Sequence, residues 1–364
     1  MRRLALLVLA LLLLTGCGGQ PQPSQAPTPA VTPTPTAPPT PDPTPEPTPY
    51  DGPVNPLTGL PVDEAWADRR PVAVMINNLQ QALPQLGISQ ADLIYEVPAE
   101  GGITRMLAVY QDPSGVGTIG SIRSARPYFL ELALGHDAIF IHAGGSEDAY
   151  SKIRAWGVTA LDGVRGPYLG KSPGSNLLWR DPERRKTYSL EHTVVTTGET
   201  VARFLENSTS LRLTAREDLD RPLVFLPDAT PAQGSTAETI EVVFSNYKTG
   251  RFTYDPQEGK YLAEEYGQPY VDGNTGGQLA VTNVLILRTA CRYTGDSLGH
   301  ITVDLSSGGT GYLASGGRVT DLRWAKSYPD GALVYTDLDG NPLPLTQGTS
   351  YICIVPLDAT ATFS

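Results

Sequence analysis

Residues 127–146 read PYFLELALGHDAIFIHAGGS, and their pattern indicates the fold class of the N-terminal part. Proline at a first helical position, an apolar-periodic run and the closing Gly135 predict a helix over 127–134. The apolar run AIFIH at 138–142 predicts a strand, and Ser146 is placed to cap a second helix. Strand and helix signals in alternation are typical of an α/β domain.

Apolar runs on either side extend this alternation. They predict three further strands, over 72–76, 93–97 and 103–110. Thr197 is placed to cap another helix, near 201–205. We therefore predict an α/β domain over residues 55–205, with a mixed sheet and flanking helices.

The second half of the chain carries strand signals almost throughout. Runs rich in β-branched residues, separated by Gly-Gly and Asp-Gly turns, predict a mainly antiparallel β domain over 236–360. Its predicted strands are 240–244, 251–254, 260–263, 281–293, 301–305, 317–324, 332–335 and 351–355. Polar residues 206–235 form the predicted inter-domain segment. Cys291 and Cys353 lie in predicted strands. The sequence leaves two alternatives for them, a disulfide bond and two separate buried thiols.

The N-terminus predicts an exported and lipid-anchored protein. Residues 1–16 read MRRLALLVLALLLLTG, a basic start and an apolar run too short to span a bilayer. This pattern before Cys17 resembles the lipobox of bacterial lipoproteins, which implies a signal peptide cut before a lipidated Cys17. An ordinary secretory signal with an incidental cysteine is the alternative. The Pro/Thr-rich residues 17–54 predict a disordered tether. We expect the body at the extracytoplasmic face of the bacterial cytoplasmic membrane, with the membrane as a partner.

The net charge and the motifs of the sequence exclude several classes of function. The formal net charge of −11 argues against nucleic acid, because phosphate neutralisation needs a basic surface. Residues 69–192 hold 13 Lys and Arg against 12 Asp and Glu, so a small anion is admissible there. Walker A, Rossmann, HExxH and GxSxG motifs are absent from the sequence, and its histidines show no metal-ligand spacing. We therefore predict no cofactor and no metal.

Polar residues gather where predicted strands end and predicted helices begin. Arginine donors and a Gly-Gly-Ser turn at helix N-termini favour an anion, and open α/β sheets bind ligands at this place. We predict a pocket for phosphate, pyrophosphate or an anionic glycan, formed by Asn77, Asn78, Glu96, Glu100, Arg105, Arg123, Ser124, Arg126, His142, Gly144, Gly145, Ser146 and His192. The alternative is a structural ion-pair network, in which Arg105, Arg123 and Arg126 pair with Glu96, Glu100, Glu131 and Asp137.

Longer motifs resemble the YerB-like bacterial lipoprotein family, which consists of two consecutive domains of unknown function. The matching stretches are NPLTGLPV (55–62), RPVAVMINN (70–78), ADLIYEVPAEGGITRMLAVY (91–110), GSIRSARPYFLELA (120–133), DAIFIHAGGS (137–146), YDPQEGKY (254–261), DLSSGGTGYLASGGR (304–318) and GTSYICIVP (348–356). The segment RKTYSLEHTVV (185–195) departs from the family pattern, which weakens a site role for His192. The resemblance implies a membrane-tethered, extracytoplasmic protein without an established reaction.

These observations predict a cell-envelope lipoprotein that binds an anionic ligand. A fainter resemblance, in the order of strand, arginine cluster and Ala-Gly-Gly, is to cell-wall glycopolymer ligases of the LytR-CpsA-Psr type. It implies an alternative, a phosphotransferase or hydrolase of lipid-linked cell-wall intermediates. Arg123 and Arg126 would then hold pyrophosphate, with Glu96 or Glu100 as base or metal ligand. A third hypothesis is a scaffold whose acidic β domain docks an envelope protein.

Overall fold

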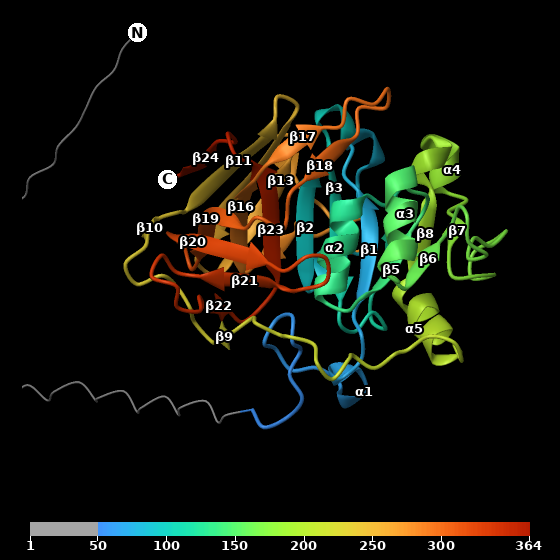
Figure 1. Ribbon diagram of the computed structural model, residues 1–364, viewed down its shortest axis with the longest axis horizontal. Coiled ribbons are helices and arrows are strands. Elements are labelled where there is room, and N and C mark those ends of the chain that lie inside the picture. The colour runs from blue at the N-terminus through green and yellow to red at the C-terminus, as the bar shows by residue number, and fades with distance from the viewer. Residues whose placement is uncertain (1–49) are drawn as a thin grey trace, which may run out of the picture. The chain divides into compact units, whose positions relative to one another are not determined.

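A strand from near the end of the chain lies in the middle of the main sheet. The computed structural model describes residues 50–364. The main sheet has the order β10 (Ser235–Thr236), β20 (Arg318–Lys326), β19 (Gly309–Ser315), β16 (Asn283–Thr289), β23 (Ser350–Pro356), β2 (Leu93–Pro98), β3 (Thr104–Tyr110), β1 (Val72–Asn77), β5 (Ile139–His142) and β6 (Ala160–Asp162), and β21 (Leu333–Thr336) pairs with β20. Strand β23 pairs in parallel with β16 on one side and with β2 on the other (Figure 1). Both predicted domains therefore contribute to one sheet.

A second sheet and three small ones accompany the main sheet. The second sheet has the order β14 (Gln268–Pro269), β13 (Lys260–Glu265), β12 (Lys248–Asp255), β11 (Thr239–Ser245) and β24 (Ala361–Phe363), with β15 (Ala280–Val281) beside β13. The small sheets pair β17 (Cys291–Tyr293) with β18 (Ile301–Val303), β9 (Phe225–Leu226) with β22 (Leu345–Thr346), and β8 (Val194–Thr197) with both β4 (Thr118–Gly120) and β7 (Trp179–Arg180). The α-helices are α1 (Glu64–Ala67), α2 (Pro127–Gly135), α3 (Glu147–Ala155), α4 (Arg184–Thr187) and α5 (Gly198–Glu206), and short 3-10 turns cover Gln80–Ala82, Ile88–Gln90, Glu100–Gly102 and Leu190–His192.

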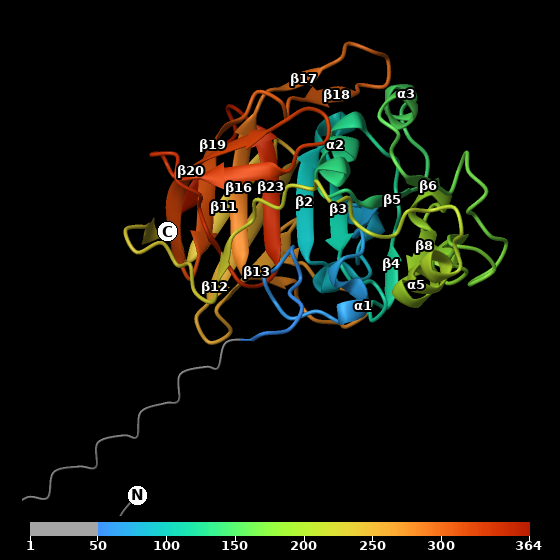
Figure 2. The ribbon, with the colours of Figure 1, turned by 60° about the horizontal axis from the view of Figure 1, so that its bottom comes forward.

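Alternating side chains of the main sheet fill two apolar cores. Val74 and Ile76 of β1 belong to a buried cluster that includes Phe252 of the second sheet. Met75, which points to the opposite face, belongs to a cluster with Phe129 of α2. The main sheet is thus the middle layer, with α2 on one face and the second sheet on the other (Figure 2).

The predicted fold class is confirmed. The N-terminal part has a mixed sheet with helices, and the C-terminal part is mainly antiparallel. One predicted strand, 281–293, is instead three strands, β15, β16 and β17, because its successive segments pair with different partners. Cys291 and Cys353 are free thiols.

The helices begin at the predicted residues, but α2 ends differently. Ser146 and Thr197 cap α3 and α5, each accepting a hydrogen bond at 3.1 Å from the backbone N–H three residues on. Gly135 is the last residue of α2, and the left-handed backbone falls on Asp137, with φ 52°. Gly135 is a glycine for a different reason, since a Cβ there would lie 2.8 Å from the carbonyl oxygen of Gly331.

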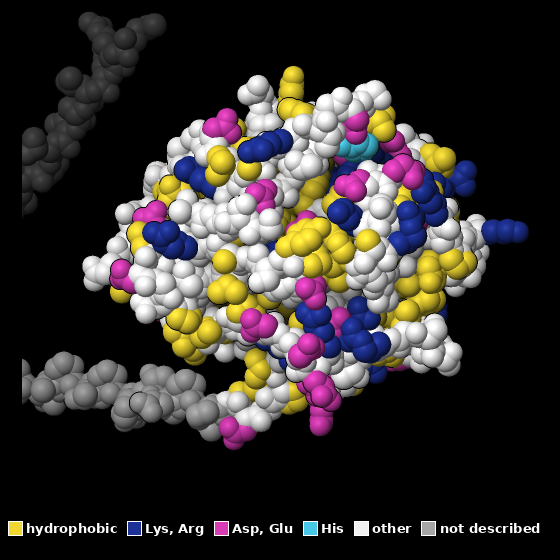
Figure 3. All heavy atoms as spheres, in the orientation of Figure 1, with side chains coloured by type: hydrophobic (Ala, Val, Ile, Leu, Met, Phe, Trp, Pro, Cys, Tyr) yellow, Lys and Arg dark blue, Asp and Glu magenta, His cyan; other side chains and the backbone are white. Residues whose placement is uncertain are grey.

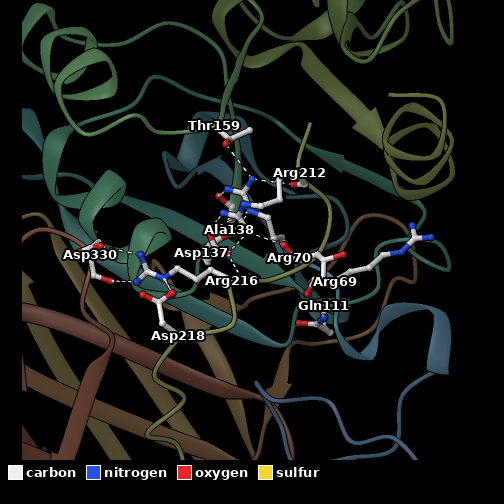
Figure 4. Close-up of polar contacts among 11 residues, drawn as sticks. Arg69, Arg70, Gln111, Asp137, Ala138, Thr159, Arg212, Arg216, Asp218 and Asp330 are labelled. Atoms are coloured by element: carbon white, nitrogen blue, oxygen red, sulfur yellow. Dashed lines mark hydrogen bonds and ion pairs between the residues drawn. The ribbon is translucent and has the colours of Figure 1, made fainter. Parts of the chain in front are cut away.

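Asp137 fastens the predicted inter-domain segment to the main sheet (Figure 4). Its carboxylate accepts two hydrogen bonds of 2.6 Å from Arg212 and one of 3.0 Å from the Arg216 backbone N–H. The buried Arg70 lies 3.4 Å away, and Arg216 continues the network to Asp330 at 2.9 Å. Burial alone would raise the pKa of Asp137, but the hydrogen bonds from Arg212 and Arg216 and the charge of Arg70 lower it below its ordinary value.

No helix within residues 50–364 is long and apolar enough to cross a membrane. The predicted signal peptide (1–16), Cys17 and the tether up to residue 49 lie outside the described residues.

We expect Asp137→Asn to lower the free energy of unfolding by about 2–4 kcal/mol at pH 7, measured by urea denaturation. Asparagine tolerates the left-handed backbone, so the change removes mainly the charge that compensates Arg70. Because the folded-state pKa is lowered, this stabilisation is present above pH of about 4 and is lost as the pH falls further.

Asp218→Asn is the matched control, because this exposed carboxylate lies 3.7 Å from Arg216. Its expected effect is within about 0.5 kcal/mol. Similar losses for the two variants at pH 7 would contradict the role given to Asp137.

Candidate functional site

The segment before α2 lies beside the loop that leads from β5 to α3. The Ala143 N–H donates to the carbonyl of Arg123 at 3.0 Å, and the Ala125 N–H donates to the carbonyl of Gly144 at 2.9 Å. The Ser146 N–H in turn donates to the carbonyl of Ala125 at 3.3 Å. These backbone bonds bring the starts of α2 and α3 together, next to the carboxyl end of β5 (Figure 1).

A cavity of about 330 Å³, the arginine cavity, opens at this place. The side chains of Arg123, Arg165 and Arg180 line it, together with the carboxylate of Glu191. Four of the thirteen predicted site residues line this cavity, namely Arg123, Ser124, Gly144 and Gly145. Lys and Arg side chains gather on the surface over α3 (Figure 3).

Protein contacts leave part of the arginine donors free. Arg123 donates to the backbone carbonyl of Glu191 at 3.0 Å, while its buried Nε has no hydrogen-bond partner within residues 50–364. Arg180 donates to the Thr193 hydroxyl at 3.3 Å. Burial lowers the pKa of both Arg123 and Arg180, because it disfavours the charged guanidinium. Arg165 is exposed and forms an ion pair with Glu147. The cavity therefore presents the partly buried positive charge of Arg123 and Arg180, which Glu191 offsets only in part.

Backbone N–H groups of the Gly-Gly-Ser turn are engaged within the protein. Gly144, at φ 84°, donates its N–H to Asp162 Oδ1 at 2.9 Å, and Ser146 donates to the backbone as described above. Asp162 also accepts hydrogen bonds from the N–H groups of Val164 and Arg165, at 2.8 and 2.9 Å. Two of the three N–H groups of the predicted backbone cradle, those of Gly144 and Ser146, are thus engaged within the protein.

Arg105 and Arg126 form the predicted structural ion pairs. Glu100 accepts a hydrogen bond from Arg126 Nε and lies 3.2 Å from Arg105 Nη2. Arg105 also donates to the carbonyl of Ser124 at 3.0 Å, which supports the wall of the arginine cavity from behind. Burial alone would raise the pKa of Glu100, but Arg105 and Arg126 lower it. The Glu100 carboxylate is therefore charged, and Arg105 and Arg126 already bind it.

Glu96 and Asn78 belong to a buried network inside the protein. Glu96 is 0% exposed and accepts hydrogen bonds from Asn78 at 2.9 Å, Thr104 at 2.6 Å and Tyr351 at 2.6 Å. Lys248, from the second sheet, lies 3.3 Å from Glu96 and forms an ion pair with Glu265 as well. Burial lowers the pKa of Lys248, although the charge of Glu96 opposes this effect. Neither Glu96 nor Asn78 lines the arginine cavity.

The remaining predicted residues lie nearby without lining the arginine cavity. Asn77 Nδ2 lies 2.7 Å from Nδ1 of the buried His192, and His142 Nδ1 lies 2.7 Å from the carbonyl oxygen of Gly144. Burial lowers the pKa of both histidines. Arg126 and Ser146 line a neighbouring cavity instead. Within residues 50–364 no group of three His, Cys, Asp or Glu side chains is placed to hold a metal ion.

Sequence reasoning missed Arg165, Arg180 and Glu191. Arg165 and Arg180 flank a stretch rich in glycine and proline that shows no strand or helix period. The one usable signal was basic density, since Arg180 is followed closely by three further basic residues.

We expect Lys248→Met to lower the free energy of unfolding by about 3–5 kcal/mol, because Glu96 and Glu265 would remain as uncompensated buried carboxylates. Urea denaturation would measure the loss, and the exposed Lys171→Met would serve as control. The double variant Lys248→Met/Glu265→Gln should regain part of the loss. No coupling between the two changes would refute the network.

Comparison with known proteins finds two family models and a solved relative. Residues 57–210 match the N-terminal domain, and residues 240–352 the C-terminal domain, of a protein of unknown function (DUF3048). YerB of Bacillus subtilis (strain 168), a protein named as a lipoprotein, is 32% identical over 312 residues, which are 84% of this chain and 87% of YerB. The crystal structure of YerB from Bacillus subtilis aligns with a TM-score of 0.72 at 30% identity, over 85% of this chain and 99% of that chain.

Proposed function

Because the chain belongs to the DUF3048 family and is a YerB-like lipoprotein, we propose that it is anchored by a lipidated Cys17 and binds a small anion in the arginine cavity. The family predicted from the sequence motifs is confirmed by the matches. The identity of the ligand and the side of the membrane on which the protein lies are parts of this proposal.

The anchoring part of the proposal rests on the N-terminal sequence. A basic start, an apolar run and small residues before Cys17 form the pattern that precedes lipidation. The name of the relative YerB as a lipoprotein agrees with it. Two acyl chains would hold the protein stably, at the extracytoplasmic face.

Replacing the acceptor cysteine tests the anchor. We expect Cys17→Ser to abolish incorporation of radiolabelled palmitate and to release the protein from the membrane fraction. Cys291→Ser is the control, since this thiol lies in the folded part and should change neither result. Palmitate label that persists in Cys17→Ser would refute the assignment.

The anion-binding part rests on one observation above all, the buried and unpartnered Nε of Arg123, whose side chain is partly exposed and lines the cavity. A buried donor without a partner costs about 1–3 kcal/mol, and a ligand oxygen that contacted it would recover this cost. Arg180 adds a second guanidinium group that matches phosphate oxygens in paired geometry, and Arg165 adds a third that also forms an ion pair with Glu147. Phosphate and pyrophosphate are therefore the ligands that this cavity suits best.

The residues of the cavity support binding rather than turnover. Glu96 and Glu100, the predicted base or metal ligand, are tied to Lys248 and to Arg105 and Arg126 respectively. Glu191 lines the cavity, but its backbone carbonyl and its carboxylate both face Arg123, the latter at 3.7 Å. The geometry thus favours no second function.

Titration of the purified full-length protein with pyrophosphate tests the cavity. We expect Arg180→Ala to weaken binding about tenfold or more, because it removes a charge-assisted donor. Arg165→Ala should weaken binding less, because Arg165 is half-exposed and already forms an ion pair with Glu147. Binding should also weaken with rising salt.

Arg154→Ala is the matched control, an exposed arginine on α3 that does not line the cavity. Equal affinities of the Arg180 and Arg154 variants would count against the site. So would a wild-type protein that binds no pyrophosphate at millimolar concentration.

A further inference from the structure

A second cavity, of about 640 Å³, adjoins the arginine cavity. Ser124 and Gly145 line both cavities, so they share part of a wall. The volume lies in the range of about 300–1,000 Å³ that is usual for pockets holding small organic ligands. A ligand bound in one cavity is therefore adjacent to the other.

Three elements form most of the wall of the second cavity. Asp148 and Lys152 of α3 line it together with Trp156, the residue that caps the end of α3, and their spacing of four residues places them on one side of the helix. Helix α2 contributes Glu131, and the β17–β18 hairpin contributes His300. On the face shown in Figure 3, charged side chains of both signs surround a hydrophobic patch beside α2.

Aromatic rings form one end of the second cavity. Trp156 and Tyr328 meet edge to face, with ring centroids 5.5 Å apart and planes at 89°. Tyr328 is 54% exposed, whereas the Lys152 ammonium lies 5.1 Å from the centroid of the Trp156 ring. The face of an aromatic ring is electron-rich and attracts the polarised C–H groups of a sugar ring.

The charges of the second cavity differ from those of the arginine cavity. Arg126 forms an ion pair with Glu100, and Glu147 forms one with Arg165. Asp296 lies 2.5 Å from His300 Nδ1, and the lining residues Asp148 and Lys152 carry opposite charges. Burial raises the pKa of Glu131, although the charge of Lys326 opposes this effect, and a carboxyl group in either protonation state can form a hydrogen bond with a hydroxyl group. This cavity thus suits a neutral, hydroxyl-rich group and not a second anion.

We infer that the two cavities bind the two parts of one ligand, a phosphorylated saccharide. Its phosphate would contact Arg123 and Arg180, and its sugar ring would lie against Trp156 and Tyr328. The inference rests on the proposed anion site and names the class of ligand that it takes.

Calorimetric titration of the full-length protein with inorganic phosphate, N-acetylglucosamine and N-acetylglucosamine 1-phosphate tests the inference. We expect the sugar phosphate to bind at least about tenfold more tightly than inorganic phosphate. Tyr328→Ala and Trp156→Ala should remove that gain. Tyr293→Ala is the matched control, because Tyr293 is an exposed tyrosine of the β17–β18 hairpin that does not line the cavity.

The outcomes separate this inference from the proposed function. Equal affinity for phosphate and sugar phosphate would overturn the inference and leave the anion site standing. If the sugar phosphate still binds more tightly than inorganic phosphate in both aromatic variants, the inference is also overturned. A wild-type protein that binds neither phosphate nor sugar phosphate would overturn the anion site and the inference together.

Discussion

The parallel pairing of β2 with β23 is the contact on which the rest of the structure depends. It joins residues 93–96 to residues 350–353 and makes the main sheet continuous from β6 to β10. Because both strands are buried on both faces, α2 can cover one side and the second sheet the other. The second sheet then brings Lys248 to Glu96. The arginine cavity thus lies at the end of strands that a large sheet holds in place.

Local sequence predicted the elements better than their partners. The helix α2 and the strands β1, β2, β3 and β5 follow from apolar runs that proline and glycine bound. The position of β23 does not, since Tyr351 and Glu96 lie 255 residues apart and no local pattern reports such a contact. The run at 281–293 was read as a single strand for the same reason. A period of two shows that residues are extended, but not where one pairing ends and the next begins.

The lining of the candidate cavity was predictable to a similar extent. Arg123, Ser124, Gly144 and Gly145, which line it, stand out in the sequence because they lie at predicted helix starts, where ligands of α/β proteins often bind. Glu96 lies two residues before the end of β2, yet it faces the interior, where Lys248 and Tyr351 from the second half compensate its charge. A polar residue near the end of a strand can face a surface cavity or the protein interior. Which of the two it faces depends on partners that are distant in sequence. Arg165 and Arg180 were missed because irregular segments carry no period to place them.

The shared sheet also bears on how the chain reaches its fold. Strand β2 can pair with β3 as soon as both exist, but its other edge has no partner until residues 350–356 are available. An apolar strand with an open edge is prone to pair with other chains. The two parts of this chain share one sheet, so a chain that emerges N-terminus first completes its main sheet only when β23 is available.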